Sequence, residues 1–290
     1  PPRSTLFPYT TLFRSLHRVS GLRGRLSLWG LRLKLLRPWA AAPDPMRVYR
    51  SFSWKDTNLR VACPAFELVT RTVVEHRRLL ERYIARHPEF LTALVPVVLL
   101  DDAPEAALRM AAASELTALG PMASVAGTLA QLGVEAAMAA GCSEAIVENG
   151  GDIFIHSDQP VVIGIYAGDN AIAGKLAFRL DPQDLPLSLC TSSSKMGHSL
   201  SFGQCDLATV TARDGALADS AVTLVCNRIH SEHDLAPVLN DVGAIPGIDG
   251  VFAVKNGKIG MWGKLPQLVR NEDAGAQGKI TRDLRSDFRG

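Results

Sequence analysis

The sequence predicts an α+β fold with mostly antiparallel sheets and packed helices. Apolar residues recur at helical spacing over residues 66–86, and two helices rich in small residues are expected at 104–119 and 123–140. Between residues 145 and 190, short apolar runs are separated by turn residues, which is typical of a strand meander. Helices and strands are therefore grouped, and this favours α+β over an alternating βαβ arrangement.

The remaining elements follow in chain order. One or two strands are expected within residues 49–63, before the first helix. Gly141 is suited to cap the helix at 123–140. Strands are then expected at 145–148, 153–156, 161–166, 175–180, 187–190 and 206–212, and helices at 217–229, with a start nearer Gly215 as an alternative, and at 234–242. Asn256-Gly257, between apolar runs at 251–255 and 258–262, is the preferred signal for a type I′ hairpin turn.

Charge separates the first 45 residues from the rest. They hold eight Lys or Arg and one acidic residue, a net +7, whereas residues 46–290 hold 23 basic and 28 acidic residues, a net −5. The basic balance therefore belongs to the leader, and the domain is not expected to bind nucleic acid.

The leader itself resembles translated DNA. Residues 5–15, TLFPYTTLFRS, are what a common sequencing adapter would encode. The Arg/Leu-rich stretch at 16–45 also suits a mitochondrial-type transit peptide, and we favour read-through. We expect a non-native or disordered leader at 1–45, a domain at 46–263 and a polar, disordered tail at 264–290. A chain that starts at Met46 should keep the same melting temperature.

Two features bear on location. The most apolar run, residues 90–100, is interrupted by Thr92 and Pro96 and is too short to cross a bilayer. The five cysteines are odd in number and form no CxxC pair, which favours reduced thiols. A cytoplasmic protein without membrane contact is therefore expected.

Three short blocks within residues 147–227 carry the candidate chemistry. In the first, 148–152 (ENGGD), paired glycines predict a turn, with a ligand site as the less favoured alternative. The second, 190–203, is rich in hydroxyl groups and contains His198, which titrates near neutral pH but could also be an ordinary loop hydrogen-bonder. In the third, 217–223, Asp219 and Thr223 share a helix face and could hold a hard cation, although an Asp near a helix start also suits the helix dipole.

Together the blocks resemble a known family. The order NGGDI, then CTSS…GHSLSFG, then LADSAVT resembles the uncharacterised protein family UPF0280, which is related to ApbE, the FAD:protein FMN transferases. Upstream blocks such as Gly120-Pro121-Met122-Ala123 support the resemblance, which covers residues 46–263. It implies an ApbE-like fold, with two T-fold-like halves around a central cleft.

The resemblance also implies roles for individual residues. Asp219, Thr223 and the backbone carbonyl of Ala123 match magnesium ligands. Asn149, Gly150, Gly151, Asp152, Thr191, Ser192 and Ser193 are expected to bind the cofactor, FAD or FMN, and His198 is the candidate catalytic residue. Two departures stand where the phosphates would lie. Ala126 occupies the position of the family's Lys, and the Asp-Pro that should follow shortly after His198 is absent.

Two hypotheses follow. The first is a Mg-dependent enzyme acting on a flavin or nucleotide phosphate, including FMN transfer to a Ser or Thr of an acceptor protein, with His198 as general base or phosphate donor. The alternative is a non-catalytic flavin- or pterin-binding protein, linked to one-carbon metabolism. The missing Lys favours the second, while Asp219, Thr223 and His198 favour the first, to which we lean. A homodimer is compatible with either.

Overall fold

The computed structural model describes residues 47–165, 176–194 and 202–270. The strands in these ranges are β1 Arg50–Trp54, β2 Thr57–Ala62, β3 Glu144–Asn149, β4 Asp152–Ser157, β5 Val161–Ile165, β6 Leu176–Leu180, β7 Leu187–Ser192, β8 Leu207–Ala212, β9 Ile248–Lys255, β10 Lys258–Gly263 and β11 Gln267–Arg270. The α-helices are α3 Phe66–Arg86, α4 Glu89–Thr92, α5 Glu105–Thr117, α6 Val125–Ala139, α7 Gly215–Arg228 and α8 Leu235–Gly243. Short 3-10 helices are η1 Pro121–Ser124, η2 Pro182–Asp184 and η3 Glu232–Asp234.

The strands form two antiparallel sheets. The larger has eight strands in the order β1-β2-β3-β4-β7-β8-β9-β10, and the smaller has the order β11-β6-β5. Each neighbouring pair runs antiparallel. The predicted α+β fold with antiparallel sheets and packed helices is confirmed.

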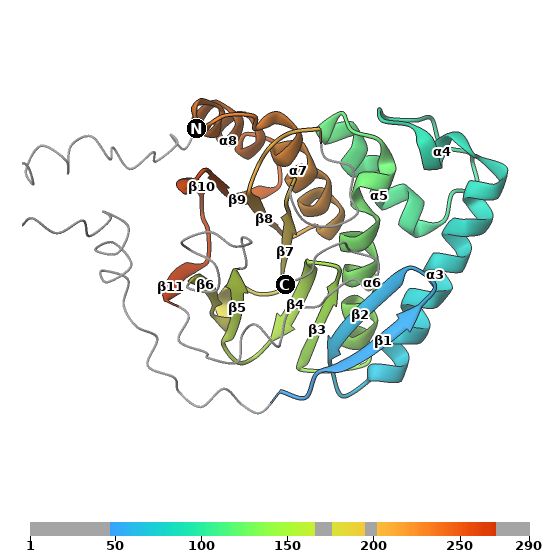
Figure 1. Cartoon of the computed structure of the whole chain (residues 1–290). Helices are drawn as coiled ribbons and strands as arrows, with labels where there is room; N and C mark the ends of the chain where they lie inside the picture. Colours follow the sequence, from blue (N-terminus) through green and yellow to red (C-terminus); the bar gives the residue numbers. More distant parts are fainter. Residues whose placement is uncertain (1–46, 166–175, 195–201, 271–290) are drawn as a thin grey trace, which may run out of the picture.

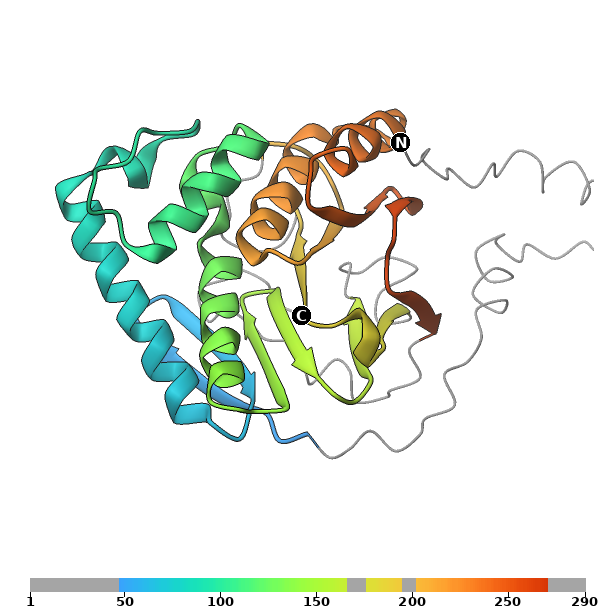
Figure 2. The same ribbon diagram turned by 180° about the vertical axis from the view of Figure 1, so that it is seen from behind.

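The large sheet lies between the helices and the small sheet. Side chains alternate across a strand, and β9 shows the consequence. Its Val251 and Ala253 pack with α7 and α8, whereas Phe252 and Val254 pack with residues of β5 and β6. Figures 1 and 2 show the same division, with β5, β6 and β11 away from the helices. The helix-facing side of the large sheet is where the candidate residues converge.

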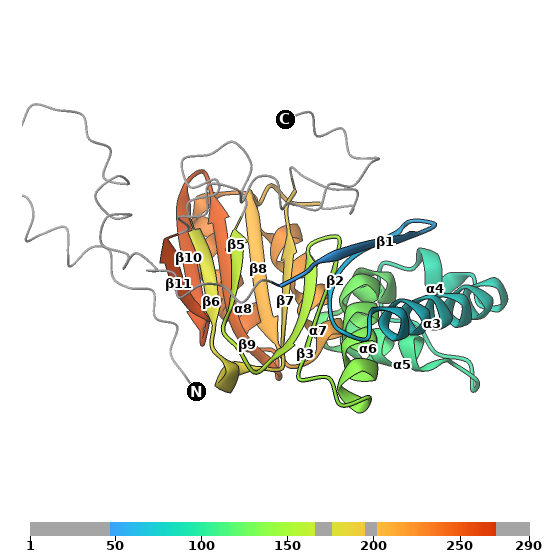
Figure 3. The ribbon, with the colours of Figure 1, turned by 90° about the horizontal axis from the view of Figure 1, so that it is seen from below.

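The helices follow their apolar spacing. On α3, the buried Val69, Val73 and Leu80 lie on the face that packs toward α6 and α5. Helices α6 and α7 lie against the centre of the large sheet, α6 over β3 and β4 and α7 over β7 and β8. Figure 3 shows α3, α5 and α6 beside the end of the sheet that carries β1 and β2. The two central helices therefore position residues over the middle of the sheet.

The local turn and cap predictions are confirmed. Asn256 and Gly257 have φ values of 48° and 76°, as a type I′ turn requires, and join β9 to β10. Gly141 follows α6 with φ of 84°. Helix α7 begins at Gly215, the earlier of the two starts considered, because the Asp214 side chain accepts a hydrogen bond from the Leu217 N–H at 3.0 Å and caps the helix.

The predicted boundary after Gly263 is wrong. Strand β11 pairs with β6, and its Val269 is buried in the small sheet. Two adjacent apolar side chains, Leu268 and Val269, give little periodic signal, and pairing with a strand distant in the sequence decides the structure. Residues up to Arg270 therefore belong to the domain. The expected leader at 1–45 and the rest of the expected tail lie outside the described residues.

Within the described ranges, no helix combines the length and the apolar character needed to cross a bilayer.

Candidate active site

The first predicted block forms the turn between β3 and β4. Gly150 and Gly151 have φ values of 68° and 111°, which L-residues with side chains rarely adopt, and Asn149 pairs with Asp152 across the turn. The favoured turn prediction is thus confirmed. The Asn149 side chain also donates from Nδ2 to the carbonyl oxygen of Ala126 at 3.3 Å, which ties the turn to the first turn of α6.

Asp152 lies beside Cys190. The two residues are directly paired between β4 and β7, and Cys190 packs on the helix-facing side with α7. Both side chains are buried, and the Cys190 Sγ lies 3.4 Å from Ser188 Oγ. The Oδ1 atom of Asp152 has no hydrogen-bond partner in the described structure. A buried carboxylate oxygen without a partner is unfavourable, so this atom is available to a ligand.

Asp219 caps a helix other than its own. It lies in the second turn of α7, and its Oδ2 accepts a hydrogen bond from the Gly127 N–H of α6 at 2.8 Å. The first N–H groups of a helix have no partner within the helix. Ser124, the residue before α6, makes no side-chain capping bond, and its hydroxyl donates instead to the Pro121 carbonyl. Asp219 replaces this missing cap, an arrangement that also places a carboxylate at the positive end of α6.

Two glycines make this contact feasible. A Cβ atom on Gly127 would overlap the carbonyl oxygen of Gly215 and lie 2.8 Å from the Asp219 Cβ. A Cβ on Gly215 would in turn lie 2.6 Å from the carbonyl oxygen of Gly127. The Gln131 side chain fixes the same crossing, because its Oε1 accepts from the Gly215 N–H at 2.7 Å. Helices α6 and α7 therefore touch backbone to backbone, which brings Asp219 to the start of α6.

The buried acids share one electrostatic environment. Burial raises the pKa of Asp152 to about 7, and nearby Glu148 adds to the effect, while hydrogen bonds to Cys190 and the Thr191 backbone oppose it. Burial, and then the charge of Asp152, also raise the pKa of Asp219 well above its ordinary value, against the hydrogen bonds from α6. The Cys190 thiol pKa is raised by burial and by both carboxylates. Without a cation, this cluster favours its protonated, neutral state.

The predicted metal ligands offer oxygen atoms only. Thr223 is half-buried and lies one turn after Asp219 on α7, so the two side chains share a face. Ala123 belongs to η1, which packs against α7. No group of three or more His, Cys, Asp or Glu side chains suited to a metal occurs in the described part of the chain. A site here would combine carboxylate, hydroxyl and carbonyl oxygens, a set that fits magnesium, and the unpartnered Oδ1 of Asp152 fits a nearby cation.

The three predicted hydroxyl residues diverge. Thr191 Oγ1 lies 3.2 Å from Thr209 Oγ1, and by strand alternation both face the small sheet rather than Asp219. Ser193 is buried, and its hydroxyl donates to the Asp206 carbonyl at 2.8 Å. Ser192 instead reaches α7. The pKa of Cys226 is lowered mainly by a hydrogen bond with Cys205 and, to a smaller extent, by one with the Ser192 hydroxyl. Cofactor binding by these residues stays a prediction.

His198 lies outside the described residues. The described chain on either side of it is anchored near the C-terminal half of α7. The Ser194 N–H donates to the Cys205 carbonyl at 3.0 Å, and the Phe202 N–H donates to Asn227 Oδ1 at 2.9 Å. The catalytic role of His198 stays a prediction.

One member of the cluster was missed from the sequence. The charges of Asp152 and Asp219 both raise the pKa of Cys190. The sequence indicates only that this cysteine is a reduced thiol. Strand alternation is the signal that could have found it. Cys190 near the end of β7 and Asp152 at the start of β4 are paired, and both face the helices. The strand pairing needed to use that signal is not visible in the sequence.

Comparisons with known proteins agree on one family. The profile of the family described as AbpE bacteria matches residues 47–244. A UPF0280 protein of Methanocaldococcus jannaschii is 40% identical over 220 residues, which are 74% of this chain and 89% of that protein. A UPF0280 protein of Methanosphaerula palustris is 43% identical over 203 residues, 70% of this chain and 84% of that protein.

Similar solved structures are more distant. The apo form of the flavinyl transferase ApbE of Pseudomonas stutzeri is 14% identical, with 79% of this chain and 96% of that chain covered and a TM-score of 0.47. The ApbE protein of Thermotoga maritima is 13% identical, with 82% and 100% covered and a TM-score of 0.49. The match to the family profile and the identity to the UPF0280 proteins together show that this chain belongs to the AbpE bacteria family, among the UPF0280 proteins.

Proposed function

We propose that this protein is a magnesium-dependent enzyme that acts on the phosphates of a flavin nucleotide. The observation that carries the proposal is the pair of buried acids Asp152 and Asp219 at the start of α6, where one carboxylate oxygen lacks a partner. Both acids have a raised pKa, chiefly because of burial and of a neighbouring carboxylate charge. A bound cation would supply the missing positive charge.

Different residues of the site would bind the metal, orient its ligand and accept the proton. Asp219, Thr223 and the carbonyl of Ala123 would hold magnesium, which supplies charge neutralisation at phosphate oxygens when bound. The Gly127 N–H orients the Asp219 carboxylate, and Gly150 and Gly151 leave the backbone open where the turn meets the site. His198 would accept the proton of the attacking hydroxyl.

The flavin assignment follows from the family and from the resemblance of the sequence blocks to FAD:protein FMN transferases. In such a reaction the P–O–P linkage of FAD is cleaved, AMP leaves, and the FMN phosphate forms an ester with a Ser or Thr hydroxyl of an acceptor protein. The hydroxyl proton passes to the base.

A second candidate is a protein that binds a flavin or pterin without chemistry. Ala126, at the position of the family's Lys, favours it, because the first turn of α6 then offers backbone N–H groups but no cationic side chain to a phosphate. This candidate predicts reversible binding and no product.

The test is incubation of the protein with FAD and MgCl2, followed by mass spectrometry of the protein and of the small molecules. The proposal predicts AMP together with covalent flavin, and loss of both in Asp219→Asn. Bound but intact FAD would support the second candidate instead. If neither a product nor FAD binding is detected, both candidate functions are contradicted.

A further inference from the structure

The basic charge of the domain is concentrated on β1, β2 and α3. Residues 50–86 hold eight Lys or Arg and four acidic residues, a net +4, whereas the rest of 46–290 holds 15 basic and 24 acidic residues, a net −9. A domain that is acidic elsewhere thus carries one basic segment. Such a charge asymmetry attracts anionic partners to that segment.

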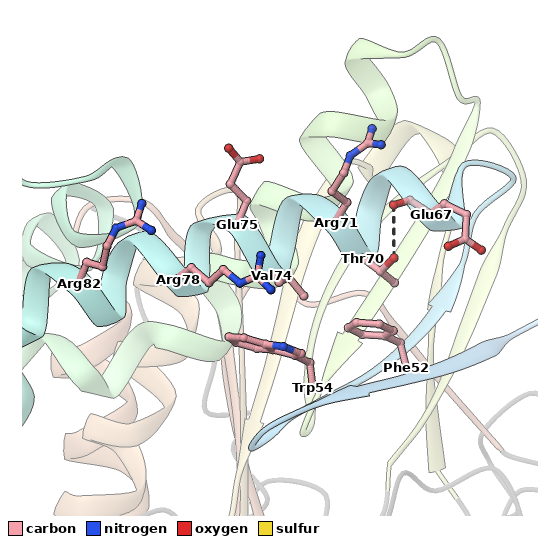
Figure 4. Close-up of a pocket in the computed structure, with 9 residues that line it drawn as sticks. All are labelled: Phe52, Trp54, Glu67, Thr70, Arg71, Val74, Glu75, Arg78 and Arg82. Atoms are coloured by element: carbon pink, nitrogen blue, oxygen red, sulfur yellow. Dashed lines mark hydrogen bonds between the residues drawn. The ribbon is translucent and has the colours of Figure 1, made fainter.

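A groove of about 680 Å³ runs along this segment between β1 and the outer side of α3. Figure 4 shows Phe52 and Trp54 rising from β1 toward the helix, with Val74 and Thr70 above them. The charged side chains that line it come from α3, and they are Glu67, Arg71, Glu75, Arg78 and Arg82. The groove therefore has an aromatic floor and a charged wall.

Three arginines in the wall form no ion pair within the described ranges. They are Arg71, Arg78 and Arg82, and all three are exposed. Neighbouring basic residues differ in this respect, since Arg50 pairs with Glu67 at 2.8 Å and Arg77 pairs with Asp56 at 2.9 Å.

The three also lie along one line. They occupy one helix face, and at 1.5 Å per residue the row from Arg71 to Arg82 spans about 17 Å. The Arg78 guanidinium additionally lies 5.6 Å from the centre of the Trp54 ring. An elongated anionic ligand matches this row better than a compact one.

The opposite wall is an open sheet edge. β1 is the terminal strand of the large sheet and is paired only with β2 in the described structure. Alternate N–H and C=O groups of a terminal strand point outward and can pair with another extended chain. β1 has five residues, which at 3.3 Å per residue also span about 17 Å. The sheet edge and the arginine row are therefore of equal length.

We propose that this groove binds an extended acidic segment of a partner protein, which adds to the edge of β1 and directs carboxylates toward Arg71, Arg78 and Arg82. Alternate residues of an extended chain lie about 6.7 Å apart, close to the roughly 6 Å axial rise between Arg78 and Arg82. The stems of these acidic side chains pass over Phe52 and Trp54, and the residues between the acids point to the other face of the sheet. This is strand addition, with charge selecting the partner.

A polypeptide fits the groove better than a nucleic acid. Glu67 and Glu75 lie among the arginines and would repel a continuous phosphate backbone, whereas a peptide can place neutral residues beside them. The β1 edge also offers main-chain pairing that only a polypeptide can complete. The proposal depends on this groove alone and is independent of the chemistry at Asp219.

The experiment measures fluorescence anisotropy of a labelled pool of nine-residue peptides with Glu at alternate positions and Thr, Val or Phe between them. The full chain should bind this pool at least about tenfold more tightly than the same pool with Lys in place of Glu. The double variant Arg78→Glu and Arg82→Glu should weaken binding of the Glu pool at least about tenfold. Asp219→Asn should bind it like the unmodified protein.

The matched control is Arg270→Glu, an exposed arginine on β11 that lies outside the groove. It changes net charge as each groove substitution does and should alter affinity by less than about twofold. Circular dichroism and melting curves check that the variants fold. We expect them to fold because the substituted arginines are exposed.

Three results would overturn the proposal. The first is equal binding of the Glu and Lys pools, and the second is unchanged affinity in the double variant. The third is tighter binding of a single-stranded oligothymidylate than of the Glu pool, lost in the same double variant, which would assign the groove to nucleic acid.

Discussion

The Asp219 carboxylate on α7 accepts a hydrogen bond from the Gly127 N–H on α6 at 2.8 Å, across 92 positions of the sequence. One side chain thereby joins the two central helices and sits beside the buried Asp152 of β4. The contact gives Asp219 two roles, as the cap of α6 and as the proposed metal ligand. Substitutions of Asp219 can distinguish the capping role from the metal-binding role.

In metal-free protein, Asp219→Asn should cost little stability and Asp219→Ala should cost more. The Asn amide oxygen can still accept from Gly127, and a neutral amide resembles the protonated acid that burial favours. Ala leaves a buried N–H without a partner, at a cost of about 1–3 kcal/mol. Urea unfolding measures the difference, and equal stability of the two variants would show that the capping contact contributes nothing.

Stability of the metal-free protein should fall as the pH rises from about 4 to 7. Asp152 has a folded pKa of about 7, above its ordinary value, so the folded state holds a proton that the unfolded chain has released over this range. The slope is at most about 1.4 kcal/mol per pH unit for such a group, and Asp219 acts in the same direction. Melting curves in EDTA should show this fall, and Asp152→Asn should flatten it. A stability that rises over the same range in both proteins would refute the assigned shift.

Gly127→Ala should destabilise the protein by about 1–3 kcal/mol, because the added methyl group meets the Gly215 carbonyl and the Asp219 Cβ. Gly133→Ala on the same helix is the matched control. Its methyl group would lie 3.2 Å from side-chain carbons of Val69 and Val73 rather than against backbone, and Ala favours the helix over Gly by about 1 kcal/mol. Chemical denaturation should rank Gly127→Ala as the less stable, and the reverse order would mean that the helices can move apart cheaply.

His198→Gln should lower turnover by roughly a hundredfold or more and leave folding and ligand affinity nearly unchanged, because Gln keeps hydrogen bonding but cannot transfer a proton near neutral pH. Steady-state rates with FAD and magnesium measure the effect, and ligand titration is the control for binding. Normal turnover in this variant would identify His198 as a hydrogen-bonding residue of its loop.

Local patterns were enough to predict much of the fold. The helix at 66–86 matches α3 in the structure because its apolar spacing alone defines a buried face. Asn256-Gly257 predicted its hairpin because few other residues adopt two successive positive φ values. In both cases, neighbouring residues hold the whole signal.

The site needed information that neighbouring residues do not hold. Asp219 and Thr223 could be placed on one helix face, but the capping of α6 by Asp219 depends on how α6 and α7 cross. Cys190 joins the acids only because β7 pairs with β4, and β11 exists only because β6 lies beside it. The raised pKa of Asp152 likewise reflects burial beneath distant elements. Contacts of this kind follow from tertiary packing.

Magnesium-dependent stabilisation of the FAD-bound protein tests the account most directly. A ligand at a hundred times its dissociation constant stabilises a folded protein by about 2.7 kcal/mol, which a melting curve resolves easily. With FAD present, added MgCl2 should raise the melting temperature of the unmodified protein and of Asp241→Asn, a change to an exposed carboxylate on α8. Asp219→Ala should abolish the magnesium response. An unchanged magnesium response in Asp219→Ala would contradict the assignment of the metal to this site.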